Sequence, residues 1–106
     1  MIAAIPLSDN SKEATVSDRF ARSPYFALVF TTTKEVAVVA NPCLPAKARA
    51  GNCVVDFLTN NYRVNAFIAT DLGWKIQQLA ADQKIQIVLL KKARTKLSEI
   101  LALMKI

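Results

Sequence analysis

The stretch Val16–Phe30, VSDRFARSPYFALVF, joins a charged loop to the start of an apolar strand. Pro24 cannot donate a hydrogen bond to a sheet, so it belongs at the beginning of a strand rather than in its middle. Ahead of it, Asp18, Arg19 and Arg22 crowd together, and each guanidinium offers several donors in a planar fork. The stretch therefore predicts a β-strand from Pro24 and, before it, a loop that can bind an anion. A solvated loop without a ligand is the alternative interpretation.

Apolar runs and helical patterns alternate along the rest of the chain. Strands are expected at Met1–Leu7, Pro24–Thr31, Lys34–Asn41, Val64–Thr70 and Ile85–Leu90. Helices are expected at Lys47–Asn61, directly after Gly73, and at Thr95–Met104. The second and third strands are separated only by threonines, which favours an antiparallel hairpin. This order of expected strands and helices predicts a single α/β domain over residues 1–106, with a mixed five-stranded sheet and helices on both faces.

Composition favours a cytoplasmic protein. The chain has 106 residues and is 53% hydrophobic, enough for one domain with a core of its own. No apolar run approaches the roughly 18 residues that cross a bilayer. The N-terminal segment MIAAIPLSDN lacks the basic and long apolar regions of a signal peptide, and it is expected to be a buried strand. No membrane association is expected.

The residues that most enzymes use are scarce. Histidine is absent, which removes the usual general base and the common catalytic triads. Metal-assisted phosphodiester cleavage needs clustered carboxylates, and only Asp9, Asp18 and Asp71 are candidates. Cys43 and Cys53 match no zinc motif, and a disulfide between them is not expected in a reducing compartment. The chain is therefore predicted not to be an enzyme.

The formal net charge of +6 raises the question of nucleic-acid binding. A basic cluster, Lys91, Lys92, Arg94 and Lys96, leads into the last helix without neighbouring aromatic residues. Single-stranded nucleic acids bind best to basic grooves with aromatic platforms, so the distribution argues against this partner.

The long irregular segments are predicted to converge at one edge of the sheet. In an open α/β sheet, ligands bind beyond the carboxyl ends of the parallel strands. Four segments would lie there: Ser8–Arg22, Asn41–Cys53, Thr70–Gly73 and the turn after Leu90. The first two are the longest irregular pieces, and long loops in small domains are usually functional. They bring cations and both cysteines, a combination suited to an anionic, sulfur-rich metal cluster. Arg19 and Arg22 are expected to hold its charge.

Several motifs together resemble one family. They are a first strand ending at Pro6, the stretch VSDRFARSPYF, a hairpin ending in Asn41-Pro42, Ala50-Gly51-Asn52 before a helix, a VNAFIA strand and Asp71-Leu72-Gly73 before the next helix. In this order they resemble the dinitrogenase iron-molybdenum cofactor biosynthesis family, which includes NifX-type carriers and the C-terminal domain of NifB. The resemblance covers essentially the whole chain.

The resemblance implies a ribonuclease-H-like fold and a carrier of iron–molybdenum or related metal–sulfur clusters. A protein of a metal-cofactor assembly pathway is the implied partner. The predicted cofactor-binding residues are Asp18, Arg19, Arg22, Cys43, Arg49, Gly51, Asn52, Asp71 and Gly73, and the predicted metal ligands are Cys43 and Cys53.

The chain departs from the family pattern at two places. The family usually shows His-Phe-Gly where this chain has Arg19-Phe20-Ala21, and the turn before the first helix, Lys47–Gly51, also lacks the family's histidine. Arginine keeps an affinity for anions but supplies no metal-coordinating nitrogen. The alternative hypothesis is therefore a regulatory or assembly protein that has lost cluster binding. A homodimer through the Lys34–Asn41 strand is also open, although Lys34 and Glu35 guard that edge.

Four residues have individual expectations for their exposure or conformation. Cys43 lies between prolines and is expected to be partly exposed, whereas Cys53 is expected to be a small buried residue or a ligand. Gly73 is expected to serve a turn that requires a positive φ. Trp74 is expected to belong to the inner face of its helix.

Overall fold

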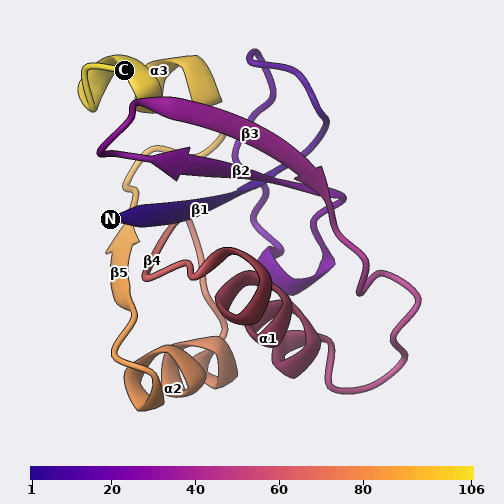
Figure 1. Cartoon of the computed structure of the whole chain (residues 1–106). Coiled ribbons are helices and arrows are strands. Elements are labelled where there is room, and N and C mark those ends of the chain that lie inside the picture. The colour runs from indigo at the N-terminus through magenta and orange to yellow at the C-terminus, as the bar shows by residue number, and fades with distance from the viewer.

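The computed structural model describes all 106 residues and shows one mixed five-stranded sheet (Figure 1). Its strands are β1 (Ile2–Leu7), β2 (Tyr25–Phe30), β3 (Glu35–Ala40), β4 (Ala66–Ala69) and β5 (Gln86–Leu89). They lie in the order β3-β2-β1-β4-β5. β2 is antiparallel to both β1 and β3, whereas β4 is parallel to β1 and β5 is parallel to β4. The expected hairpin and all five expected strands are confirmed.

Helices cover both faces of the sheet, as expected. They are α1 (Ala50–Tyr62), α2 (Trp74–Asp82) and α3 (Leu97–Leu103). In Figure 1, α1 and α2 lie below the sheet and α3 lies above it. β1 is apolar along its length because it is the central strand and is buried on both faces: Ala4 packs into the core under α1 and α2, whereas its neighbours Ala3 and Ile5 pack toward α3.

The strand directions place most of the long connections at one edge, here called the carboxyl edge. β1, β3, β4 and β5 all end there, and β2 begins there. The connections 8–24, 41–49, 70–73 and 90–96 therefore leave or enter the sheet at this edge. The predicted convergence of the long loops is confirmed.

Backbone pairing holds the first of these connections in place. Val16 forms an antiparallel bridge with Leu7, and Thr15 forms one with Lys96. The loop then enters a short 3-10 helix, η1 (Phe20–Arg22), whose Phe20 ring packs 4.7 Å from that of Phe67. Phe20 thus fixes the charged stretch to the core, although Asp18, Arg19 and Arg22 themselves stay exposed.

Several element ends differ from the sequence expectation. α1 includes Tyr62, one residue beyond the expected end at Asn61. The next residue, Arg63, caps the helix, and its backbone adopts the left-handed conformation with a φ of 55°. Trp74 is the first residue of α2 and is 71% exposed, so its expected place on the inner face is wrong. Ile76 and Ala80 form that face instead. Gly73 has a φ of −58°, so the expected positive φ is wrong too.

Six residues other than glycine have a positive φ, and every one of them is a lysine or an arginine. They are Lys34, Arg49, Arg63, Lys84, Arg94 and Lys105. Lys84 closes α2 in a Schellman motif, in which Ile85 N donates to Ala80 O at 2.8 Å and Lys84 N donates to Ala81 O at 3.2 Å. No helix is long and apolar enough to cross a membrane.

Candidate functional site: two helix N-termini at the carboxyl edge

One pocket at the carboxyl edge is formed where the N-termini of α1 and α2 approach each other. It has a volume of about 340 Å³. We call it the helix-terminus pocket, and it is lined by Ala21, Arg49, Ala50, Gly51, Asn52, Lys75 and Ile76. The three predicted residues Arg49, Gly51 and Asn52 therefore share one site. Ala21 belongs to the charged stretch that precedes β2, so this stretch also reaches the pocket.

Gly51 permits the close approach of the two helices. A Cβ atom at this position would lie 2.9 Å from Cδ1 of the buried Ile76 on α2. Contacts this short essentially never occur, so any side chain at residue 51 would displace Ile76 or part the helices. The role of Gly51 in the structure is therefore steric.

The electrostatics of the pocket favour an anion. Neither α1 nor α2 has a side-chain cap or an acidic residue in its first turn, so the free N–H groups and the positive ends of both helix dipoles remain uncompensated. Arg49 and Lys75 add two positive charges, and no acidic residue lines the pocket. The arrangement can hold a negatively charged group by charge-assisted hydrogen bonds.

Asn52 supplies a further sign of a missing partner. Its Oδ1 atom is buried and has no hydrogen-bond partner, which is uncommon because a buried polar atom without a partner is costly. The side chain belongs to the first turn of α1, inside the lining of the pocket. Because Oδ1 only accepts hydrogen bonds, a group that carries an N–H or O–H would satisfy it, and this atom does not add to the preference for an anion.

The donor set decides what kind of cargo could fit. The pocket lining contains no thiolate, imidazole or carboxylate, so the protein has no group there that could coordinate a metal. Nowhere in the structure do three or more His, Cys, Asp or Glu side chains gather in a metal-binding arrangement. N–H groups and cations instead suit a preformed anionic cluster, bound through its outer atoms.

Arg22 has a different environment from the one expected. Its Nη1 atom donates to Leu44 O and Ala46 O, the first at 3.3 Å. Asn41 strengthens the same junction, because its Nδ2 donates to Ala21 O at 3.1 Å and to Ser23 O at 2.9 Å. The charged stretch and the 41–49 connection therefore contact each other, as predicted. Arg22 uses its donors to hold that contact and does not line the pocket.

The two cysteines contradict the expectation of free thiols. Cys43 and Cys53 form a disulfide, with their Cα atoms 5.9 Å apart. Cys43 is 1% exposed, packed in the core under α1, whereas Cys53 is exposed on the first turn of α1, so both burial expectations are wrong. The cause is the path of the 41–49 connection, which folds back onto α1. Neither sulfur is a thiolate here, and the predicted ligand role would require reduction.

The remaining predicted residues do not join the helix-terminus pocket. Asp18 lines a separate pocket together with Thr70 and Arg94. Arg19, Asp71 and Gly73 are exposed and line neither pocket. The expectation of one shared concavity is therefore wrong. What these residues bind stays a prediction.

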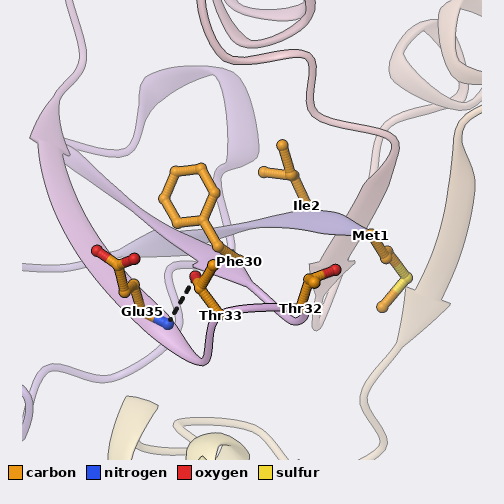
Figure 2. A pocket seen from close by; sticks show the side chains of 6 residues that line it. All are labelled: Met1, Ile2, Phe30, Thr32, Thr33 and Glu35. Atoms are coloured by element: carbon orange, nitrogen blue, oxygen red, sulfur yellow. Dashed lines mark hydrogen bonds between the residues drawn. The ribbon is translucent and has the colours of Figure 1, made fainter.

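A third pocket, of about 410 Å³, lies at the other end of the strands, where β1 and β3 begin and β2 ends. Figure 2 shows the Phe30 ring between the side chains of Ile2 and Glu35, its partners on the neighbouring strands β1 and β3. Met1, Thr32 and Thr33 complete the lining. Its only charged side chain is the carboxylate of Glu35, so this pocket does not favour an anion.

Lys75 is the charged lining residue that the sequence analysis did not single out, and it is exposed. Its position in the first turn of a helix without an acidic residue was the available signal, because cations are unfavourable there unless an anion compensates them.

Comparisons with known proteins identify the family. The family model described as "Dinitrogenase iron-molybdenum cofactor" matches residues 1–105. The chain belongs to this family. The resemblance stated from the motifs is therefore confirmed, and a link to the iron–molybdenum cofactor comes with the family. A search of curated proteins finds no match.

Solved structures of low sequence identity share the family fold. The apo form of the orange protein from Desulfovibrio gigas has a TM-score of 0.82 at 17% identity, covering 95% of this chain and 83% of that one. A protein from Thermotoga described as NifB has a TM-score of 0.75 at 23% identity, covering 98% of this chain and 86% of that one. At these identities the likeness shows the fold.

Proposed function

We propose that the protein binds a preformed anionic metal–sulfur cluster, or a precursor of one, in the helix-terminus pocket and carries it to a partner protein. The family membership supports the class of cargo. The pocket supports the mode of binding, because two uncapped helix N-termini and two cations face it without any acidic residue. This electrostatic arrangement is the observation that carries the proposal.

In the proposed complex, the backbone N–H groups of Ala50, Gly51 and Asn52 donate to sulfide or oxo atoms of the cargo. Arg49 and Lys75 balance its charge. Because no protein atom replaces a ligand of the cluster, the cargo can leave intact, as transfer to a partner requires. The role is one of binding, without a catalytic step.

Binding of tetrathiomolybdate, a small anionic metal–sulfur probe, tests the pocket directly. Titration followed by visible absorption under anaerobic conditions should give saturable binding. Lys75→Ala should weaken binding by about tenfold, the loss expected for one charge-assisted hydrogen bond. Arg49→Asn should act similarly, and asparagine tolerates the left-handed backbone at this position.

Lys12→Ala is the matched control, because it removes the same charge from an exposed residue outside the pocket. An equal effect of Lys12→Ala and Lys75→Ala would mean that only net charge matters, and the pocket would be rejected. Anaerobic purification, or reconstitution with iron, sulfide and molybdate, then tests the cargo. Metal analysis without stoichiometric metal in both preparations would rule out the carrier role.

The second candidate is a regulatory or assembly protein that has lost cluster binding. The arginine in place of the family's usual histidine and the bonded state of both cysteines favour it, because neither leaves a metal-coordinating atom. It predicts that Lys75→Ala leaves partner binding unchanged. Co-purification of partners from the native host with the wild-type and Lys75→Ala proteins separates the two candidates.

Further parts of the proposal have indirect support. The mixed sheet with its N-terminal hairpin supports the ribonuclease-H-like assignment. A cytoplasmic location and a partner in a cofactor-assembly pathway fit the family. In a reducing cytoplasm the Cys43–Cys53 bond would form only under oxidising conditions. A homodimer through β3 has the support of an unpaired edge with three valines, Val36, Val38 and Val39.

A further inference from the structure

A second pocket lies at the carboxyl ends of the central parallel strands. Its volume is about 280 Å³. We call it the switch-point pocket, and it is lined by Ser8, Thr15, Val16, Ser17, Asp18, Thr70, Ala93 and Arg94. Ser8 directly follows β1 and Thr70 directly follows β4, the two strands between which the chain changes its direction across the sheet. Ligands of open α/β sheets bind at this point.

Most groups in the switch-point pocket are hydrogen-bond donors without a fixed partner. Ser8 Oγ and Thr15 Oγ1 lie 3.1 Å apart, so one hydroxyl donates to the other and the second proton stays free. The Thr70 hydroxyl and the backbone N–H groups of Ala93 and Arg94 have no protein acceptor. Two successive free N–H groups at a residue with a φ of 57° form a concavity of the kind that binds anions.

Arg94 adds the charge that an anion needs. Both ion pairs of the structure involve other residues, so the Arg94 guanidinium has no carboxylate partner. Its left-handed backbone is shared with five other basic residues of the chain, so the guanidinium and not the backbone conformation is the feature that matters here. The pocket thus offers a guanidinium, hydroxyls and amides to one small ligand.

Asp18 makes the pocket selective. An ionised carboxylate only accepts hydrogen bonds, so it repels an anion that has no proton and accepts from one that has. Sulfate carries no proton near neutral pH, whereas inorganic phosphate keeps at least one. A site with one carboxylate among many donors therefore discriminates between these two oxyanions of the same shape.

We propose that the switch-point pocket binds a protonated phosphate group, with Asp18 accepting a hydrogen bond from its P–OH group and Arg94 donating to its negative oxygens. The group belongs to inorganic phosphate or to the monoester of a small molecule. This site is separate from the helix-terminus pocket, and the proposal does not depend on the function of that pocket.

Isothermal titration calorimetry in a mildly acidic buffer tests the proposal, because phosphate and phenyl phosphate both carry a proton there and sulfate does not. We expect sulfate to bind at least about tenfold more weakly than the better of the two phosphates. Tighter binding of inorganic phosphate would identify the free ion as the ligand, and tighter binding of phenyl phosphate would identify a monoester. Equal binding of phosphate and sulfate, or no binding of any probe, would overturn the proposal.

Two exposed substitutions complete the test. Asp18→Asn supplies an amide that can donate, so the preference for phosphate over sulfate should disappear; an unchanged preference would refute the role of Asp18. Arg94→Asn keeps the left-handed backbone and should weaken phosphate binding by about tenfold, and an unchanged affinity would refute the site. Lys12→Ala, which removes a charge outside both pockets, is the control that should leave phosphate binding unchanged.

Discussion

Loss of the Cys43–Cys53 disulfide should lower the stability of the protein substantially. The bond closes a loop with a sequence separation of 10 residues. The chain-entropy relation for a loop of this length gives about 3 kcal/mol of stabilisation, because the reduced unfolded chain regains the freedom that the bond removes. Since small domains are stable by only about 5–15 kcal/mol, this is a large share.

Cys53→Ser is the informative substitution because Cys53 is exposed and serine keeps its size. Urea denaturation followed by circular dichroism should give the same unfolding free energy for the Cys53→Ser protein and for the reduced wild type, about 3 kcal/mol below the oxidised wild type. Cys43→Ser should cost a further 1–3 kcal/mol or so, because it also buries a hydroxyl in an apolar core.

Thiol titration before and after reduction provides the control for the bonded state. Coincident unfolding midpoints of the oxidised and reduced wild-type proteins would refute the reasoning, because the loop would then be held by other contacts. The hydrogen bonds of Arg22 to the carbonyls of Leu44 and Ala46 would be the first alternative to examine, through Arg22→Ala.

Three further substitutions test other parts of the structure. Lys84→Gly should raise the unfolding free energy by about 0.5 kcal/mol in thermal denaturation, because glycine relieves a φ of 58°, whereas Lys84→Ala should give no gain. The hydrogen bond from the Lys92 ammonium holds the pKa of Glu99 below its ordinary value of 4.5, so Glu99 stabilises the fold at neutral pH and this contribution fades as the pH falls through the lowered pKa. The unfolding free energy of Glu99→Gln should therefore approach that of the wild type in acid. A difference between the two proteins that grew in acid would contradict this direction. Gly51→Ala should reduce tetrathiomolybdate binding, because its Cβ would displace the end of the Ile76 side chain in the pocket lining. Its unfolding free energy should change little, because alanine favours the helix, and an unchanged affinity would show that Ile76 can shift without disturbing the pocket.

The sheet could be predicted from the sequence because its signals are local. Pro24 marks the start of β2, and Asn41-Pro42 marks the end of β3, so the hairpin is bounded on both sides by residues that cannot continue it. The apolar run of β1 could only be a strand buried on both faces. The mixed character of the sheet followed from the few topologies that short, right-handed connections allow, whereas the strand order comes from the structure.

The candidate site was harder to predict because it depends on distances between loops. Nothing in the spacing of Cys43 and Cys53 shows that the 41–49 connection folds back onto α1. Asp18 and Arg49 were expected together because both belong to loops at the carboxyl edge. These loops line different pockets at that edge, which strand order alone cannot reveal.

Trp74 shows a related difficulty with helical periodicity. The spacing of apolar residues in a helix of nine residues allows more than one inner face, and the large ring was assigned to the core. Ile76 faces the core instead because Gly51 of α1 leaves space for it. A contact between two helices decided the rotation of α2, and such a contact has no signature within the helix itself.

The basic residues at left-handed positions have a consequence for how anions reach the protein. Of the 14 lysines and arginines in the chain, six occupy these turns and helix ends, where glycine is common in other proteins. The chain contains only two glycines. These six positive charges therefore lie at turns and helix ends along the whole chain and do not form one patch. The resulting field attracts anions from many directions, so their association should be rapid at low ionic strength and slow steeply as salt is added.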